Sequence, residues 1–304
     1  MNHLLYVTKA DGSRELFEEE KLAESLKRVG GSDALIDEIV EKIEAEMNSS
    51  MTTGEIYQHA FELLRKHEAP VAVKYSLRRA LSELGPEGFP FEKYIAELFR
   101  AQGYQALTDQ MVMGACVPHE VDVVAWNEQK LVMVEAKFHN EFGLKSDVKV
   151  ALYVKARFDD IKGNMFDYGG IHRTMTEGWL VTNTKFTDQA IKYGECKGLK
   201  MIGWNYPHHG SLQHIIESSG LHPLTCLVSV SNVHKKLLIA KGVVLCRDLK
   251  QRPELLKQVG LDNLRIAQII EEIDSVCGVS LAPQQSPSES SSQAPFPAST
   301  LISA

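Results

Sequence analysis

The chain has 304 residues, of which 44% are hydrophobic and 24% are charged, and its formal net charge is −7. This length exceeds what one hydrophobic core usually organises, and the composition is that of ordinary soluble protein, so we expect two or three folded domains. The sequence has no apolar run of the ~18 residues that span a bilayer and no signal-peptide pattern. These features argue against a membrane protein and predict a cytoplasmic one.

Five cysteines are scattered along the chain, and none of them forms a CxxC pair. This spacing predicts reduced thiols rather than a disulfide framework or a zinc knuckle. The negative charge argues against a large nucleic-acid surface, because phosphate backbones favour basic proteins. It does not exclude a nuclease, since the acidic excess is largest in residues 1–85 and a nuclease needs carboxylates for its metal.

The first predicted domain covers residues 1–86 and opens with a short strand over residues 4–8 and a turn at Asp11-Gly12. Thr52 and Glu55 have the spacing of a capping box, in which each side chain satisfies a free amide at the start of a helix. Helical periodicity predicts four helices, over residues 18–29, 33–47, 54–67 and 71–84.

Three basic side chains, Lys9, Arg14 and Lys21, cluster around this predicted strand–turn–strand unit. Cations in such a cluster could bind phosphates, and a solvated charged hairpin is the alternative interpretation. The sequence contains no GxxxxGK[ST] loop, so it does not support a P-loop nucleoside triphosphatase.

The order of these residues resembles the ATP-cone, the nucleotide-sensing domain of ribonucleotide reductases and of their transcriptional repressors. The resemblance spans residues 4–84 and is carried by VTKADGSRELF (residues 7–17), by Thr53 and by AVKYSLRRA (residues 72–80). The family usually has a basic residue after the lysine, whereas this chain has Ala10. The resemblance implies that ATP or dATP binds as an effector, without hydrolysis, against Lys9, Arg14, Glu15, Lys21 and Thr53.

The second predicted domain, residues 87–220, follows the segment GPEGFP (residues 85–90), which cannot continue a helix. Helical and strand patterns alternate after this break, which predicts an α/β domain with one sheet covered by helices. The expected elements are helices over residues 91–102, 146–162 and 187–197, and strands over residues 121–126, 131–137, 178–182 and 200–204.

Two of these strand patterns, HEVDVVAW (residues 119–126) and LVMVEAK (residues 131–137), are separated by the polar turn NEQK and predict a β-hairpin. A symmetric turn pairs Trp126 with Leu131. It thereby brings Asp122 opposite Glu135, on one face and with Cβ atoms ~4.5–5.5 Å apart. Side chains alternate along a strand, so Lys137 shares this face.

Two opposed carboxylates in a valine-rich hairpin repel each other and are costly to bury. A divalent cation between Asp122 and Glu135 removes this conflict, because Mg²⁺ prefers one or two carboxylates together with water and phosphate oxygens. Lys137 could then orient the attacking water or stabilise negative charge on the phosphate. The alternative is that Asp122 lies at a solvated strand edge and that Glu135 and Lys137 form a surface ion pair.

The set Asp122…Glu135-Ala136-Lys137 resembles the D…(D/E)xK signature of the restriction-endonuclease-like superfamily, in the branch similar to Mrr-type enzymes. The resemblance implies a DNA endonuclease dependent on Mg²⁺ or Mn²⁺, in which Asp122 and Glu135 hold the metal and Lys137 assists the water. It also implies that Glu97, on the opening helix, can reach the metal region, and a solvated helix position is the alternative for this residue. The resemblance covers about residues 89–205 and includes FEKYIAELF (residues 91–99), LVTNTKFT (residues 180–187) and IGW (residues 202–204).

Residues 221–278 are predicted to form short helices with glycines at Gly242 and Gly260. KKLLIAKGV (residues 235–243) and LLKQVGL (residues 255–261) resemble tandem helix-hairpin-helix elements, whose glycine bends let backbone amides approach a DNA phosphate. A small helical packing or dimerisation module is the alternative. The Ser/Pro/Gln-rich residues 279–304 are predicted to be a disordered tail.

The predicted fold class is therefore multidomain α+β and α/β: a small β-hairpin with helices, a central sheet domain and a small helical segment. The leading functional hypothesis is a Mg²⁺-dependent endodeoxyribonuclease regulated by ATP or dATP, with DNA and the nucleotide as partners. A nucleotide-responsive DNA-binding regulator that does not cut is the second hypothesis. An effector-controlled homo-oligomeric scaffold is the third.

Overall fold

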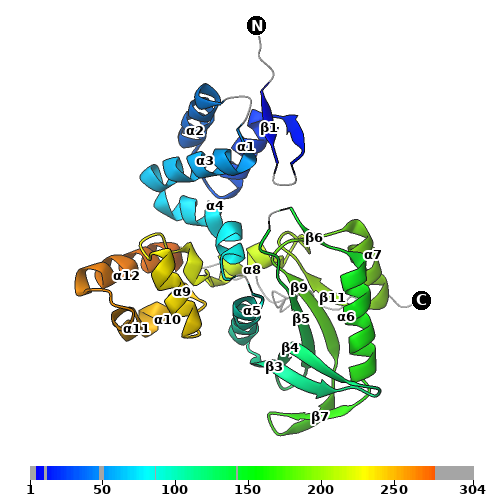
Figure 1. Ribbon diagram of the computed structural model, residues 1–304. Helices are drawn as coiled ribbons and strands as arrows, with labels where there is room; N and C mark the ends of the chain where they lie inside the picture. Colours follow the sequence, from blue (N-terminus) through cyan, green and yellow to red (C-terminus); the bar gives the residue numbers. More distant parts are fainter. Residues whose placement is uncertain (1–4, 10–11, 48–50, 86, 142, 278–304) are drawn as a thin grey trace, which may run out of the picture. The chain divides into compact units, whose positions relative to one another are not determined.

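The computed structural model describes residues 5–9, 12–47, 51–85, 87–141 and 143–277 (Figure 1). The chain divides into two compact units, Met1–Arg79 and Ala80–Ala304. The predicted tail over residues 279–304 and Asp11 of the predicted turn lie outside the described residues. No helix in the described part of the chain is both long enough and apolar enough to cross a membrane.

The first unit contains the predicted hairpin and helices. In the hairpin Thr8 pairs with Arg14 in an antiparallel ladder. The predicted capping box is confirmed, because the Thr52 hydroxyl accepts the Glu55 amide at 3.1 Å and the Glu55 carboxylate accepts the Thr52 amide at 2.8 Å. The elements are β1 (Tyr6–Thr8), β2 (Arg14–Leu16), α1 (Glu19–Arg28), α2 (Asp33–Glu46), α3 (Thr53–His67) and α4 (Ala69–Ser82).

The apolar faces of these helices form one core, in which Leu26, Ile39, Ile43 and Leu64 are at most 1% exposed. Each aliphatic side chain buried in this way contributes roughly 1.5–3 kcal/mol. The core explains why the 3.6-residue periodicity of the sequence predicts these helices correctly.

The second unit contains a mixed five-stranded sheet in the order β11-β9-β5-β4-β3. Strands β3, β4 and β5 are antiparallel neighbours, whereas β9 and β11 continue the sheet in parallel. The predicted α/β fold is confirmed. The elements are α5 (Phe89–Ala101), β3 (Gln105–Met113), β4 (Pro118–Trp126), β5 (Leu131–Lys137), β6 (Lys145–Ser146), α6 (Val148–Ile161), β7 (Met165–Tyr168), β8 (Ile171–Thr174), β9 (Glu177–Thr182), β10 (Lys185–Phe186), α7 (Asp188–Lys197) and β11 (Lys200–Ile202).

Strand β3 was not predicted from the sequence. It is one of the two edge strands of the sheet, and polar residues such as Gln105 and Gln110 interrupt its apolar pattern. An edge strand pairs on one side only, so its sequence carries a weaker hydrophobic signal than that of a central strand.

Helices cover both faces of the sheet, with α5 on one face and α6 and α7 on the other (Figure 1). On the α5 face, the rings of Phe99 and Trp179 meet edge to face at 5.7 Å. On the opposite face, Val154 of α6 and Ala190 of α7 share a core with Leu180 of β9. Side chains of the same strand therefore reach two separate helix layers.

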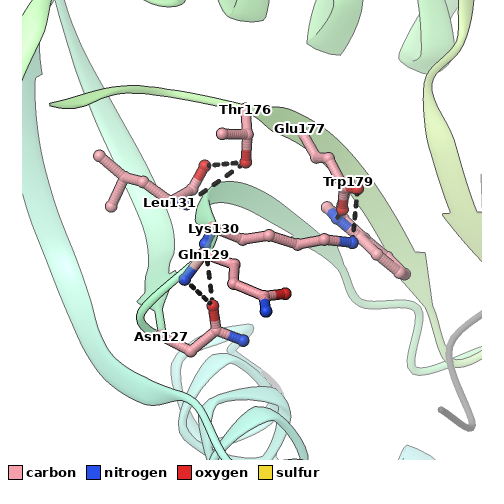
Figure 2. A network of polar contacts seen from close by, with 7 residues as sticks. All are labelled: Asn127, Gln129, Lys130, Leu131, Thr176, Glu177 and Trp179. Carbon is pink, nitrogen blue, oxygen red and sulfur yellow. Dashed lines mark hydrogen bonds and ion pairs between the residues drawn. The ribbon is translucent and has the colours of Figure 1, made fainter. Parts of the chain in front are cut away.

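The β4–β5 hairpin has the predicted register, with Trp126 paired to Leu131. Figure 2 shows how its turn is fixed: the Asn127 carboxamide oxygen accepts the amides of Gln129 and Lys130 at 2.9 and 2.8 Å. The Lys130 ammonium bonds to Glu177 of β9 at 2.8 Å, and Glu177 also accepts the Trp179 indole N–H at 2.9 Å. Because one end of the hairpin is tied to β9, the register cannot slip without breaking this network.

Helices follow the sheet domain, as predicted for residues 221–278, of which the structure describes residues 221–277; the last of them, α12, has 15 residues and is longer than predicted. Gly242 and Gly260 follow α9 and α11 with φ of +83° and +92°, a region that glycine adopts without strain. The Tyr94 hydroxyl of α5 donates to the Leu221 carbonyl at 2.7 Å, so this segment is joined to the helix that covers the sheet. The elements are α8 (Leu212–Ser219), the 3₁₀ turn η1 (Leu224–Cys226), α9 (Asn232–Ala240), α10 (Cys246–Gln251), α11 (Glu254–Gln258) and α12 (Asn263–Cys277).

Candidate active site

Strands β4 and β5 separate at the predicted carboxylates. Their ladder runs from Trp126–Leu131 to Val123–Val134 and ends there. The Asp122 carboxylate instead accepts the Ala136 amide at 2.7 Å. The prediction that Asp122 and Glu135 form a ladder pair is therefore wrong. After Val123–Val134 the two strands diverge and form a fork, with Asp122 on one branch and Glu135 on the other. The physical reason is that two like charges repel, and the Asp122 side chain bonds directly to the β5 backbone.

The neighbouring ladder is also interrupted at this point. Strands β3 and β4 pair through Thr108–Val123 and Gln110–Val121, and the ladder skips Asp122 and Asp109. Asp109 has φ of +54°, which is uncommon for a residue other than glycine. Such local breaks in a sheet redirect side chains and are frequent next to active sites.

The fork opens into a cavity of about 320 Å³. The structure brings the predicted residues Asp122, Glu135 and Lys137 together on its wall, and it adds Glu92 from the first turns of α5. A cavity of this size is large enough for a phosphate group with its cation and water. The remaining lining residues are Gly88, Ala136, Phe138 and Asn140.

The carboxylates of the cavity all have raised pKa values. Burial raises the pKa of Asp122 to about 7, and the nearby Glu135 carboxylate adds to this shift. Burial likewise raises the pKa of Glu92 to about 7, with Asp122 as the next cause. The pKa of Glu135 is raised by burial although Arg157 and Lys137 oppose the shift. The folded site therefore disfavours the charged form of these carboxylates, and a bound cation would stabilise that form.

The donor set fits a hard divalent cation. In the described residues no three His, Cys, Asp or Glu side chains form a group arranged to hold a metal ion. Mg²⁺ does not require such a group, because it binds through one or two carboxylates and completes its octahedron with water and phosphate oxygens. Asp122 and Glu135 are the residues that would hold it, since both line the cavity and both gain from a neutralising charge.

Glu97 does not line this cavity. Its carboxylate lies 2.5 Å from the Arg100 guanidinium and 3.7 Å from that of Arg247. Glu92 lies five residues earlier, which rotates its side chain by ~140° around the helix relative to Glu97. The structure therefore places Glu92, and not Glu97, with the predicted carboxylates.

A signal for Glu92 is present in the sequence of α5. Its buried residues Phe91, Ile95, Ala96 and Phe99 flank position 92 on the helix surface. A carboxylate within the apolar stripe of a helix has to be paired, protonated or functional, whereas one on the opposite face is usually solvated. Position 97 lies outside this stripe.

The chain beyond Lys137 is held by one buried amide. The Asn183 side chain accepts the His139 amide at 2.9 Å and donates to the His139 carbonyl at 2.7 Å. Asn183 itself is only 2% exposed. This two-point contact fixes the backbone just after Lys137, whose side chain is exposed and can reach into the cavity.

In the first unit the structure brings together part of the predicted nucleotide site. The Lys9 ammonium lies 2.5 Å from Glu15, and the Glu15 charge also acts on Lys21, whose closest partner is Glu18 at 2.9 Å. Arg14 points to the other side of its strand, with its guanidinium 5.6 Å from the centroid of the Tyr6 ring.

Thr53 lies close to this hairpin, near Thr8 of β1. It is the first residue of α3, and a parallel bridge between Thr8 and Thr52 brings that helix start beside β1. Lys9, Glu15 and Thr53 are thus gathered near one end of the hairpin, while the Arg14 side chain would have to turn to join them.

Three family models match this chain in consecutive segments. The "ATP cone domain" matches residues 5–84, "Restriction endonuclease" matches residues 85–204, and "AF1548-like, C-terminal" matches residues 222–277. A protein of Archaeoglobus fulgidus described as an uncharacterized protein is 36% identical over 185 residues, which are 60% of this chain and 100% of that protein. The chain belongs to this AF1548-like family.

A solved structure gives the same relationship. The "Crystal Structure of Protein of Unknown Function AF1548" is 34% identical, has a TM-score of 0.52, and covers 63% of this chain and 99% of that one. The predicted combination of an ATP cone with a restriction-endonuclease-like domain is confirmed. The third segment, where the sequence resembles helix-hairpin-helix elements, matches the AF1548-like C-terminal model.

Proposed function

We propose that this protein is a Mg²⁺-dependent endodeoxyribonuclease whose activity is regulated by ATP or dATP bound to its ATP cone. The observation that carries the proposal is the meeting of Asp122, Glu135 and Lys137 on one cavity, within the segment that matches the restriction endonuclease model. Mn²⁺ is expected to substitute for Mg²⁺. A cytoplasmic location belongs to the same proposal.

The four charged residues of the cavity each have a role in phosphodiester hydrolysis. Asp122 and Glu135 would hold the cation, which would supply charge neutralisation at the phosphate and activation of water. Lys137 donates a hydrogen bond that orients the water or stabilises the developing negative charge. Glu92 faces them from α5 and can accept a hydrogen bond from water in the cavity.

The proposal assigns a separate role to each of the three predicted domains. Residues 1–86 bind the nucleotide through Lys9, Arg14, Glu15, Lys21 and Thr53, residues 87–220 cut DNA, and residues 221–278 contribute to DNA binding. Exposed lysines on these helices, such as Lys236 of α9 and Lys257 of α11, support the last assignment because cationic side chains bind DNA phosphates.

Cleavage of supercoiled and linear DNA tests the proposal directly. With Mg²⁺ or Mn²⁺ we expect the wild type to cut, and we expect added ATP or dATP to change the rate, because the nucleotide favours one state of the ATP cone. EDTA should abolish the reaction. A wild type that binds ATP and DNA but leaves several DNAs intact would overturn the nuclease assignment and favour a DNA-binding regulator.

The two glutamates of α5 should behave differently. Replacing Glu92 by glutamine is expected to lower the cleavage rate by about 10–100-fold, because a charged group next to the cation is lost. Glu97→Gln is the matched control and should stay within about threefold of wild type, because its partners are Arg100 and Arg247. Equal losses in the two variants would contradict the placement of Glu92 in the site.

A further inference from the structure

Arg157 is a buried cation in contact with Glu135, one of the carboxylates of the proposed metal site. It extends from α6, is 8% exposed, and does not belong to the residues that line the cavity. One guanidinium nitrogen donates to the carboxylate of Glu135, and another donates to the backbone carbonyl of Glu120. The guanidinium carbon lies 5.2 Å from the centroid of the Tyr153 ring. No motif in the sequence singles out this residue.

The two contacts of Arg157 lie on the two branches of the fork. Glu120 belongs to β4, two residues before Asp122, and Glu135 belongs to β5. No ladder bond joins the two strands beyond Val123–Val134, so the guanidinium provides a connection where the backbone pairing has ended. A guanidinium is planar and its N–H groups point in fixed directions, so it holds two acceptors at a defined separation.

We propose that Arg157 is a positioning residue that sets the distance between the two metal-holding carboxylates, Asp122 and Glu135. It engages one oxygen of Glu135 and leaves the second for a cation in the cavity. Asp122 is fixed in turn by the Ala136 amide, so both carboxylates are oriented before a cation arrives. This inference rests on the proposed function, because it assigns Arg157 to the same metal site.

A positioning role and simple charge repulsion predict opposite changes in metal affinity when Arg157 is replaced. A guanidinium close to Glu135 repels a divalent cation, so removal of its charge alone would tighten metal binding. A positioning role predicts weaker binding instead, because Glu135 loses the contact that orients it and the fork is no longer held. The direction of the change therefore separates the two explanations.

Direct measurement of Mn²⁺ binding tests this inference without relying on cleavage. The full-length chain is titrated with Mn²⁺ by electron paramagnetic resonance and by calorimetry, in the absence of DNA. The variants are Arg157→Gln, Arg157→Lys and, as a matched control on the same helix, Lys155→Gln. Lys155 pairs with Asp159 rather than with the site, so its replacement removes the same charge elsewhere. Circular dichroism and thermal unfolding establish that each variant is folded.

We expect Arg157→Gln to weaken Mn²⁺ binding by about 10–100-fold and Lys155→Gln to change it by less than about threefold. Arg157→Lys should lie between them, because an ammonium can reach one of the two acceptors but cannot bridge both. It also tests the inference if Arg157→Gln fails to fold. Unchanged or tighter binding in Arg157→Gln, or wild-type affinity in Arg157→Lys, would overturn the positioning role alone. A wild type that does not bind Mn²⁺ would overturn the proposed metal site and the positioning role together.

Discussion

Replacing Asp122 by asparagine is expected to lower the rate of Mg²⁺-dependent DNA cleavage on the order of 10³-fold or more. Asparagine retains an oxygen that can accept the Ala136 amide, the bond that is 2.7 Å long in the structure, so the fork should keep its shape. The loss comes from the missing charge, because a neutral amide holds a divalent cation far more weakly than a carboxylate does. Lys137→Ala should lose a similar amount, since the cation would still bind but the water would lack its donor.

Initial rates on supercoiled DNA across a range of Mg²⁺ concentrations measure this effect. The control is Asp167→Asn, which removes an exposed carboxylate of β7 that does not line the cavity. It should cut at the wild-type rate. The site assignment would be contradicted if Asp122→Asn retained more than about a tenth of the wild-type rate at saturating Mg²⁺, or if wild type cut equally well in EDTA.

The same substitution should stabilise the protein when metal is absent. At pH 8 and in EDTA we expect Asp122→Asn to unfold with a free energy about 1–3 kcal/mol above that of wild type. Burial raises the pKa of Asp122 to about 7 in the folded protein, whereas the carboxyl of an unfolded chain titrates near its ordinary value of ~4. At pH 8 the wild type therefore carries a partly buried charge that the asparagine variant lacks.

The pH dependence of this difference follows from the direction of the shift. A group with a raised pKa binds its proton more tightly in the folded state, so its stabilising contribution is fully present below pH ~4 and is lost as the pH rises through 7. The Asp122 charge also helps to raise the pKa of Glu92, so the asparagine variant relieves part of that shift as well. The stability advantage of Asp122→Asn should thus be largest at pH 8 and small near pH 5.

Thermal and urea unfolding at pH 5, 6, 7 and 8 in EDTA provide the measurement. Saturating Mg²⁺ at pH 8 should reverse the order, because the cation stabilises the wild type and hardly binds the variant. A constant difference between the two proteins at all four pH values would contradict the raised pKa of Asp122. Such a site sacrifices stability for function, as sites that concentrate like charge commonly do.

The register of the β4–β5 hairpin could be predicted from the local sequence. Alternation of apolar residues and the four-residue turn were enough to predict the pairing of Trp126 with Leu131, because a hairpin brings neighbours in sequence together. The same register predicts that Asp122, Glu135 and Lys137 lie close together, and in the structure all three line one cavity. It did not predict the fork, because the end of a ladder depends on how the flanking strands β3 and β9 hold their partners.

The positions of Glu92 and Arg157 at the site could not be predicted from local sequence patterns. Both reach the site from helices, and their distance from the carboxylates depends on how α5 and α6 pack on opposite faces of the sheet. The apolar stripe of α5 includes position 92 and leaves out position 97, but only the docking of α5 on the sheet brings Glu92 to the carboxylates. Periodicity gives the face of a helix but not the rotation and offset at which it docks.

The sequence by itself determined the order of the segments, the elements with strong hydrophobic period and the identity of the hairpin residues. These features depend on contacts within a few residues, where local geometry leaves few alternatives. Tertiary structure alone decided that β4 and β5 separate at Asp122, that Glu92 completes the cavity and that Arg157 bridges the fork. Those features depend on burial and on contacts between distant segments, because burial shifts the pKa of a carboxylate and packing determines which cation lies beside it.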